Sequence, residues 1–113
     1  MTTHDFLSKV KELDLLGSKE IKVKKHWEHK APSLHPIGSA NFMENDLVFH
    51  VSDYGEVKLD KIIEDLEESN EGMLRVGSFQ IHYIQPTFNG FNLVIHNKTK
   101  KVSILKWILG FLF

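Results

Sequence analysis

The sequence FQIHYIQPTFNGFNLVIH, residues 79–96, carries the strongest β-sheet signal in the chain. Apolar side chains recur at every second position, at 79, 81 and 83 and again at 91, 93 and 95, which is the period of a strand with one buried face. The dipeptide Asn89-Gly90 between the two runs is typical of a type I′ hairpin turn. The stretch therefore predicts an antiparallel pair of strands. Pro86 lacks a backbone donor, so we expect its end of the strand to lie at an edge or leave the sheet.

Further short strands are expected on both sides of this hairpin. Turn residues such as Asn45-Asp46 and Asp53-Tyr54-Gly55 interrupt the apolar runs in the middle of the chain. Segment 31–38 contains two prolines and a glycine, so we expect a loop there. A second turn is expected at 97–100. The remaining strands are predicted at 20–27, 40–43, 47–51, 57–59 and 102–108.

Two amphipathic helices complete the predicted fold. The first runs over about 3–15, with Thr3 as its N-cap and Gly17 as its stop. The second has apolar residues at the i, i+3, i+4 and i+7 positions counted from Leu59, and ends near 70–72. We therefore predict an α+β fold, with an antiparallel sheet of about six strands in two meanders and the order α-β-β-β-α-β-β-β.

The composition favours one packed domain that spans residues 1–113. Apolar residues make up 42% of the chain and charged residues 26%, close to the average of globular proteins. The chain contains no cysteine, no apolar stretch of about 18 residues that could span a bilayer, and no signal-peptide pattern at its start. We therefore expect a cytoplasmic protein without a transmembrane segment. Frequent lysine, asparagine, isoleucine and phenylalanine suggest a microbial or phage origin.

Three histidines lie close together in the sequence, at His26, His29 and His35. Three imidazoles can bind zinc and leave a position for water, so one alternative function is a small metal-dependent hydrolase. The spacing argues against this site, because on a strand His26 and His29 point to opposite faces and a proline-rich loop leads to His35. The sequence also lacks the motifs of nucleotide-binding loops and of nucleophilic catalysis, so we predict no catalytic residue and no cofactor.

A second alternative is a domain that binds single-stranded nucleic acid. Lys22, Lys24, Lys25 and Trp27 interleave cations with an aromatic ring, as stacking platforms for bases do. The net charge of −1 and the single arginine, Arg75, argue against it, because phosphate binding depends on an excess of positive charge. Nucleic acid is therefore not the expected partner.

The predicted second helix carries a dense set of acidic side chains. Glu64, Glu67 and Glu68 lie away from its apolar face. Carboxylates that fan outward from a helix have no apolar surroundings to raise a pKa, so acid–base catalysis is not expected of them. An exposed acidic face can instead steer and bind a charged partner.

The last ten residues, ILKWILGFLF at 104–113, contain eight large apolar side chains. Such a segment would aggregate if it were left exposed, so it needs a cover. A final strand in the core, an interface with another protein or a second copy, and a contact with a membrane surface all provide one. Trp107, Phe111 and Phe113 are the expected anchors of an interface, because large aromatic side chains dominate interface energetics.

The separation of lysine-rich and acidic stretches along the chain, together with the apolar C-terminal segment, favours a small non-enzymatic protein-binding module. We expect an inhibitor, immunity or accessory protein that acts by occluding a partner protein whose identity the sequence does not give. The C-terminal segment also predicts a homodimer. The metal-dependent hydrolase and the nucleic-acid-binding domain remain the alternatives.

Overall fold

The computed structural model describes residues 1–96, which form two helices and a single curled sheet of seven strands. This arrangement confirms the α+β class. The predicted turn at 97–100 and strand at 102–108 lie outside the described residues. The elements are α1 Thr3–Glu12, β1 Glu20–His26, β2 Ser33–Met43, β3 Asp46–Val51, α2 Leu59–Glu68, β4 Leu74–Val76, β5 Phe79–Gln80, β6 Tyr83–Pro86 and β7 Gly90–His96.

The sheet is mixed, so the prediction of a purely antiparallel sheet of six strands is wrong. The strand order is β5-β4-β3-β2-β1-β7-β6, and the pairs β1–β7 and β3–β4 are parallel. Helix α2 connects β3 to β4 and provides the long crossover that parallel neighbours require. The strand predicted at 57–59 does not form, because α2 begins at Leu59.

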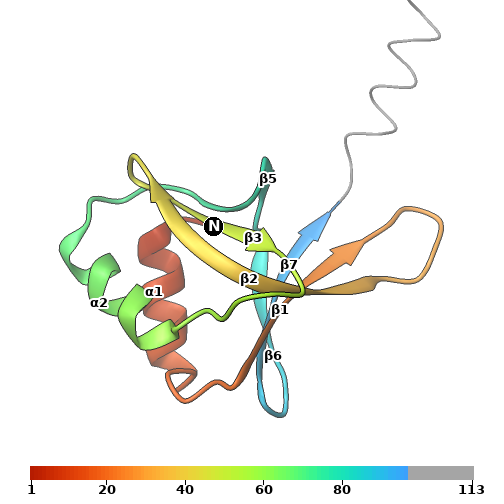
Figure 1. Cartoon of the computed structure of the whole chain (residues 1–113), viewed down its shortest axis with the longest axis horizontal. Helices are drawn as coiled ribbons and strands as arrows, with labels where there is room; N and C mark the ends of the chain where they lie inside the picture. Colours follow the sequence, from red (N-terminus) through yellow and green to blue (C-terminus); the bar gives the residue numbers. More distant parts are fainter. Residues whose placement is uncertain (97–113) are drawn as a thin grey trace, which may run out of the picture.

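Segment 79–86 joins the two ends of the sheet. Strand β5 pairs with β4 at one end, whereas β6 pairs with β7 at the other. Between them, the Ile81 N–H donates to the Leu74 carbonyl (3.1 Å) and the His82 N–H donates to the Val94 carbonyl (2.9 Å). The sheet therefore curls until its ends meet (Figure 1), and the single strand predicted at 79–83 is divided between them.

The loop predicted at 31–38 is wrong, because β2 runs through most of it. Residues 33–36 of β2 pair with β1, and the pairing with β3 begins at Ile37, with a register shift before Ser39. Pro36 is the last residue paired with β1, so its missing N–H falls where the strand changes partner. The proline is tolerated there, and the strand continues.

The hairpin between β6 and β7 is confirmed, but its turn differs from the predicted one. The Thr87 N–H donates to the Gly90 carbonyl (2.8 Å), so Phe88 and Asn89 form the loop. None of its residues has a positive φ, which a type I′ turn requires. Pro86 ends β6, an edge strand, as predicted.

The aromatic core connects α1 to two distant strands. Phe6 is fully buried, and its ring centroid lies 6.2 Å from that of Phe49 on β3 and 6.0 Å from that of Phe91 on β7. The predicted apolar face of α2 is also confirmed, since the buried residues of this helix are Leu59, Ile62, Ile63 and Leu66.

A capping box begins α1 one residue earlier than predicted. The Thr2 side chain, rather than that of Thr3, accepts a hydrogen bond from the Asp5 N–H (3.1 Å), and the Asp5 carboxylate accepts one from the Thr2 N–H (3.3 Å). Thr3 is buried, and its hydroxyl accepts a hydrogen bond from the Gly72 N–H (3.0 Å). The hydrogen bonds from Thr2 lower the pKa of Asp5 below its usual value.

Thr2→Ala should lower the free energy of unfolding by about 1 kcal/mol, because it leaves an N–H of the first turn without its acceptor. Urea unfolding at neutral pH measures the loss.

The carboxylate of Asp5 stabilises the fold in a pH-dependent way. Since folding lowers the pKa of Asp5, this stabilisation is present above the pKa that Asp5 has in the unfolded chain, and it is lost as the pH falls through the pKa that Asp5 has in the folded protein. The stability difference between the natural protein and Asp5→Asn should therefore shrink in acid, and a constant difference would contradict this role of Asp5.

Candidate protein-binding surface

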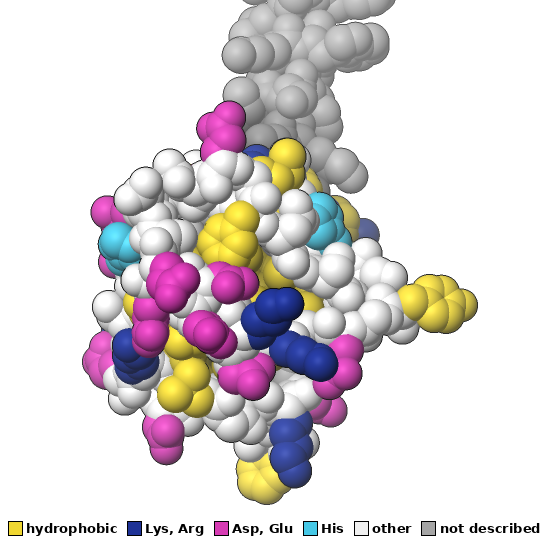
Figure 2. All heavy atoms as spheres, turned by 60° about the vertical axis from the view of Figure 1, so that its left-hand side comes forward, with side chains coloured by type: hydrophobic (Ala, Val, Ile, Leu, Met, Phe, Trp, Pro, Cys, Tyr) yellow, Lys and Arg dark blue, Asp and Glu magenta, His cyan; other side chains and the backbone are white. Residues whose placement is uncertain are grey.

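Helix α2 presents its acidic side chains to solvent. Its four buried apolar residues fix the helix on the core, which leaves Glu64, Glu67 and Glu68 exposed as predicted. Figure 2 shows acidic side chains gathered on the side of the molecule where the helices lie. Glu67 forms an ion pair with Lys11 of α1 (Oε1 to Nζ 2.8 Å), while Glu64 and Glu68 form none with any residue in 1–96. A pair between two half-exposed side chains is weak, so most of this negative charge is available to a partner.

A groove of about 410 Å³ lies between α2 and β2. Ala40 and Phe42 line it from β2, and Lys61, Ile62 and Asp65 line it from α2. Its volume is that of a small binding site, and its lining combines apolar surface with charges of both signs. We did not predict this groove, because the segment before residue 40 was expected to be a loop.

The structure does not bring His26, His29 and His35 together. His35 Nε2 contacts the Ser33 hydroxyl (2.8 Å), while exposed His29 lies 3.9 Å from the Glu28 carboxylate. His26 instead stacks on His96. Within residues 1–96, no group of three or more histidine, aspartate or glutamate side chains could hold a metal ion.

Another set of histidines does meet, at the end of β1 and β7. The His26 and His96 rings stack with their centroids 5.0 Å apart, and His82 meets His96 edge-on at 4.6 Å. The register places His26 directly beside His96 because β1 and β7 are parallel. No local spacing indicates that His26 joins this set, since its place depends on the parallel pairing of β1 with β7.

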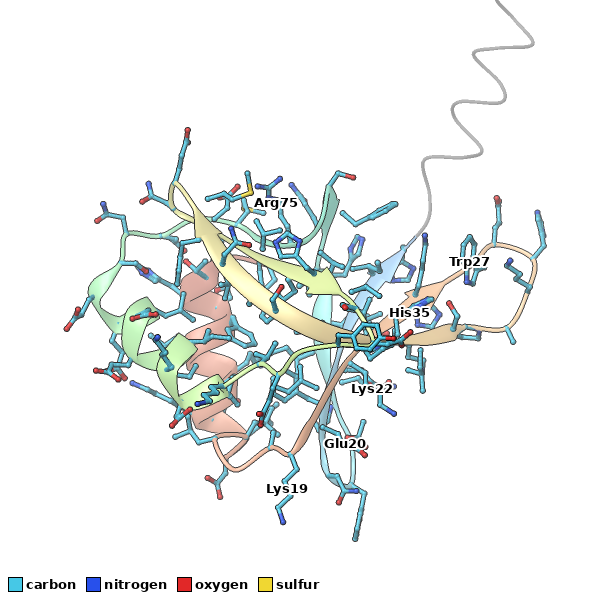
Figure 3. The ribbon with its side chains drawn as sticks, in the orientation of Figure 1. Lys19, Glu20, Lys22, Trp27, His35 and Arg75 are labelled. Atoms are coloured by element: carbon cyan, nitrogen blue, oxygen red, sulfur yellow. The ribbon has the colours of Figure 1, made fainter. Side chains whose placement is uncertain are left out.

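The lysines near Trp27 do not form one continuous platform. The ammonium groups of Lys25 and Lys30 lie 4.4 and 4.1 Å from the centroid of the Trp27 indole, so cations already occupy ring surface that a base would stack on. Lys24 instead donates to Gln85 on β6 (3.1 Å). Figure 3 shows Trp27 and His35 on the β1–β2 hairpin, away from the helices.

The predicted anchors Trp107, Phe111 and Phe113 lie outside the described residues.

No helix within 1–96 is long and apolar enough to cross a membrane. Comparisons with protein-family models, curated proteins and solved structures gave no significant match.

Proposed function

We propose that the protein is a small non-enzymatic binding module that occludes a basic surface of a partner protein. The observation that carries this proposal is the exposed acidic face of α2, formed by Glu64, Glu67 and Glu68, on a helix whose opposite face is fixed in the core. A helix held in this way presents its carboxylates in one arrangement, so binding does not have to order the helix first. Trp107, Phe111 and Phe113 are proposed as the apolar anchors of the same contact.

The charge of α2 supports a partner with clustered lysine and arginine. Separated charges of one sign accelerate encounters with an oppositely charged surface and weaken as salt is added. Carboxylates at the rim of an interface act mainly on the association rate. We therefore expect association with the partner to slow markedly at high ionic strength.

Replacing all three glutamates with glutamine tests the acidic face. A partner is first isolated by affinity capture, and the purified pair is then titrated by calorimetry. Glu64→Gln, Glu67→Gln and Glu68→Gln together should weaken affinity by about tenfold and flatten its dependence on salt, with little change in the free energy of unfolding.

A matched triple variant separates this local effect from a change in net charge. Glu12, Glu20 and Glu44 are exposed acids elsewhere in the chain. Changing these three to glutamine should leave affinity near that of the natural protein. Equal losses from both triple variants, or no loss from the α2 variant, would contradict the proposed contact.

A further inference from the structure

Half of strand β2 has an open edge. Beyond residues 33–36, which pair with β1, β2 has β3 as its partner in the described chain. Ala40 pairs with Phe49 and Phe42 pairs with Leu47. The Leu47 N–H donates to the residue before β4 (3.0 Å), and the Phe49 carbonyl accepts from the turn after β4 (3.2 Å). Both residues of β3 thus direct these groups away from β2.

Ala40 and Phe42 accordingly direct their own N–H and C=O groups away from β3. In an antiparallel ladder, residues opposite each other either exchange both hydrogen bonds or exchange none. Leu47 and Phe49 belong to the second kind, so their partners on β2 do as well. The free groups of Ala40 and Phe42 lie along the groove and bond to no other residue of 1–96. An edge of this kind is a template for another strand.

This edge is self-complementary about Asn41. If a second copy approaches with its β2 antiparallel to the first, Ala40 lies opposite Phe42 of the second copy, and Phe42 lies opposite Ala40 of the second copy. Each of these pairs can exchange two hydrogen bonds. The two-fold axis then passes beside Asn41, whose exposed side chain lies on the opposite face from Ala40 and Phe42.

The charges on the flank of α2 that lines the groove are also complementary to those of a second copy. Lys58 and Lys61 lie toward its N-terminal end and Asp65 toward its C-terminal end, all on one side of the helix. An axis that relates the two β2 edges relates the two α2 helices as well, and helices that meet across such an axis run antiparallel. Lys61 of each copy then faces Asp65 of the other. Glu56, on the loop before α2, is the remaining charged residue of the groove.

We propose that this face is a homodimer interface, in which β2 pairs with β2 of a second copy and α2 faces α2. The occupant of the groove is a second copy of this chain, because the strand edge and the helix charges are each complementary to themselves under one two-fold axis. Closed symmetry of this kind satisfies both edges at once and leaves none for further addition. None of Glu64, Glu67 and Glu68, which the proposed function uses, lines the groove, although Glu68 lies one turn after Asp65.

A charge exchange on α2 tests the dimer in the full-length chain. Lys61→Glu and Asp65→Lys each replace two attractive contacts with two repulsive ones, so each variant alone should dissociate about tenfold more readily. An equimolar mixture should recover the natural affinity as a heterodimer, because the introduced glutamate of one chain then faces the introduced lysine of the other. Light scattering over an about hundredfold range of concentration, with one chain tagged, measures both results.

Several outcomes would overturn the dimer. The dimer would be excluded if the natural protein stayed monomeric. It would also be excluded if a dimer formed but neither substitution weakened it, because association would then involve another part of the chain, such as residues 104–113. Failure of the mixture to recover association would also contradict it. Neither substitution should unfold the chain and so mimic dissociation. Lys61→Glu adds an acid near the N-terminus of α2 and Asp65→Lys adds a base toward its C-terminus, and the helix dipole favours both changes. Glu64→Lys changes a charge that does not line the groove and should leave the dimer intact.

A backbone substitution tests the strand contact separately. Ala40→Pro removes an N–H that no other residue of 1–96 uses and fills its position with the proline ring, so the edge is blocked at little cost to the ladder with β3. The variant should be monomeric where the natural protein is a dimer, with its circular dichroism spectrum retained. A dimer that persists in Ala40→Pro would show that β2 does not pair with a second copy.

Discussion

Phe6→Ala should lower the free energy of unfolding by about 3–5 kcal/mol. Phe6 is fully buried, and its ring contacts Phe49 on β3 and Phe91 on β7, so one side chain attaches α1 to two strands that are not neighbours in the sheet. Truncation removes its buried apolar surface and opens a cavity between the helix and the curled sheet. A urea unfolding curve monitored by circular dichroism and fitted to a two-state transition measures the loss.

An exposed leucine provides the control for this loss. Leu16, in the connection after α1, is 47% exposed, so Leu16→Ala should change stability by no more than about 0.5 kcal/mol. Comparable losses from Phe6→Ala and Leu16→Ala would show that the contact of α1 with the sheet contributes little. In that case α1 would be held mainly by its backbone contacts, such as the hydrogen bond from the Thr3 N–H to the Gly72 carbonyl (2.9 Å).

Local periodicity was sufficient to predict the elements whose burial repeats along the chain. The i, i+3, i+4, i+7 pattern from Leu59 identified the buried face of α2, and with it the exposure of Glu64, Glu67 and Glu68. The candidate acidic surface was therefore predictable. Its residues depend only on the rotation of one helix, which the sequence encodes within three turns.

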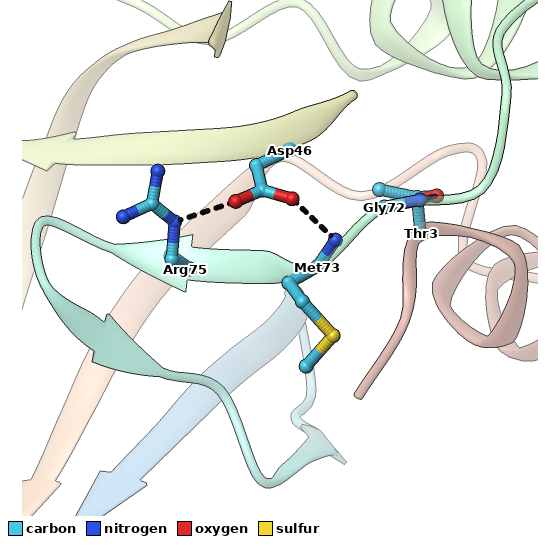
Figure 4. A network of polar contacts seen from close by, with 5 residues as sticks. All are labelled: Thr3, Asp46, Gly72, Met73 and Arg75. Carbon is cyan, nitrogen blue, oxygen red and sulfur yellow. Dashed lines mark hydrogen bonds and ion pairs between the residues drawn. The ribbon is translucent and has the colours of Figure 1, made fainter. Parts of the chain in front are cut away.

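Pairings between distant strands were not predictable from the same pattern. Figure 4 shows how β3 and β4 are held parallel: Asp46 accepts a hydrogen bond from the Met73 N–H (2.8 Å), and its other carboxylate oxygen lies 3.2 Å from Arg75 Nε in an ion pair. Just before Met73, the Gly72 N–H donates to the Thr3 hydroxyl and the Thr3 N–H donates to the Gly72 carbonyl. Each contact joins residues far apart in the chain, and no local spacing reports it.

The groove and the open edge of β2 were missed for a related reason. The prolines in 31–38 led us to predict a loop there, whereas β2 changes partner at Pro36 and continues to Met43. The free groups of Ala40 and Phe42 exist because β1 leaves β2 while β3 stays with it. An exchange of partners within one strand is a property of the whole sheet, so the sequence around Pro36 carries little information about it.

Gly90→Ala should destabilise the fold by at least about 3 kcal/mol, at the upper end of what overfilling a packed site costs. In the parallel ladder of β1 and β7, Gly90 lies opposite Glu20, and a Cβ atom at Gly90 would lie 1.9 Å from the Glu20 carbonyl oxygen. Backbone cannot yield as a flexible side chain can. The N–H groups of Lys19 and Glu20 also both donate to the Asn89 carbonyl (2.8 and 3.2 Å), so β1 cannot move away without breaking these bonds.

Gly17→Ala is the matched control, since a Cβ atom at Gly17 would have no neighbour within 4 Å and its φ is not positive. That substitution should be neutral or stabilise by up to about 1 kcal/mol, because alanine restricts the unfolded chain. Melting temperatures of the two variants measure the difference. Equal melting temperatures would mean that β1 and β7 do not approach closely at Gly90, which would also remove the pairing that places His26 beside His96. A large loss confined to Gly90→Ala would instead identify this close approach as the reason that glycine stands at the start of β7.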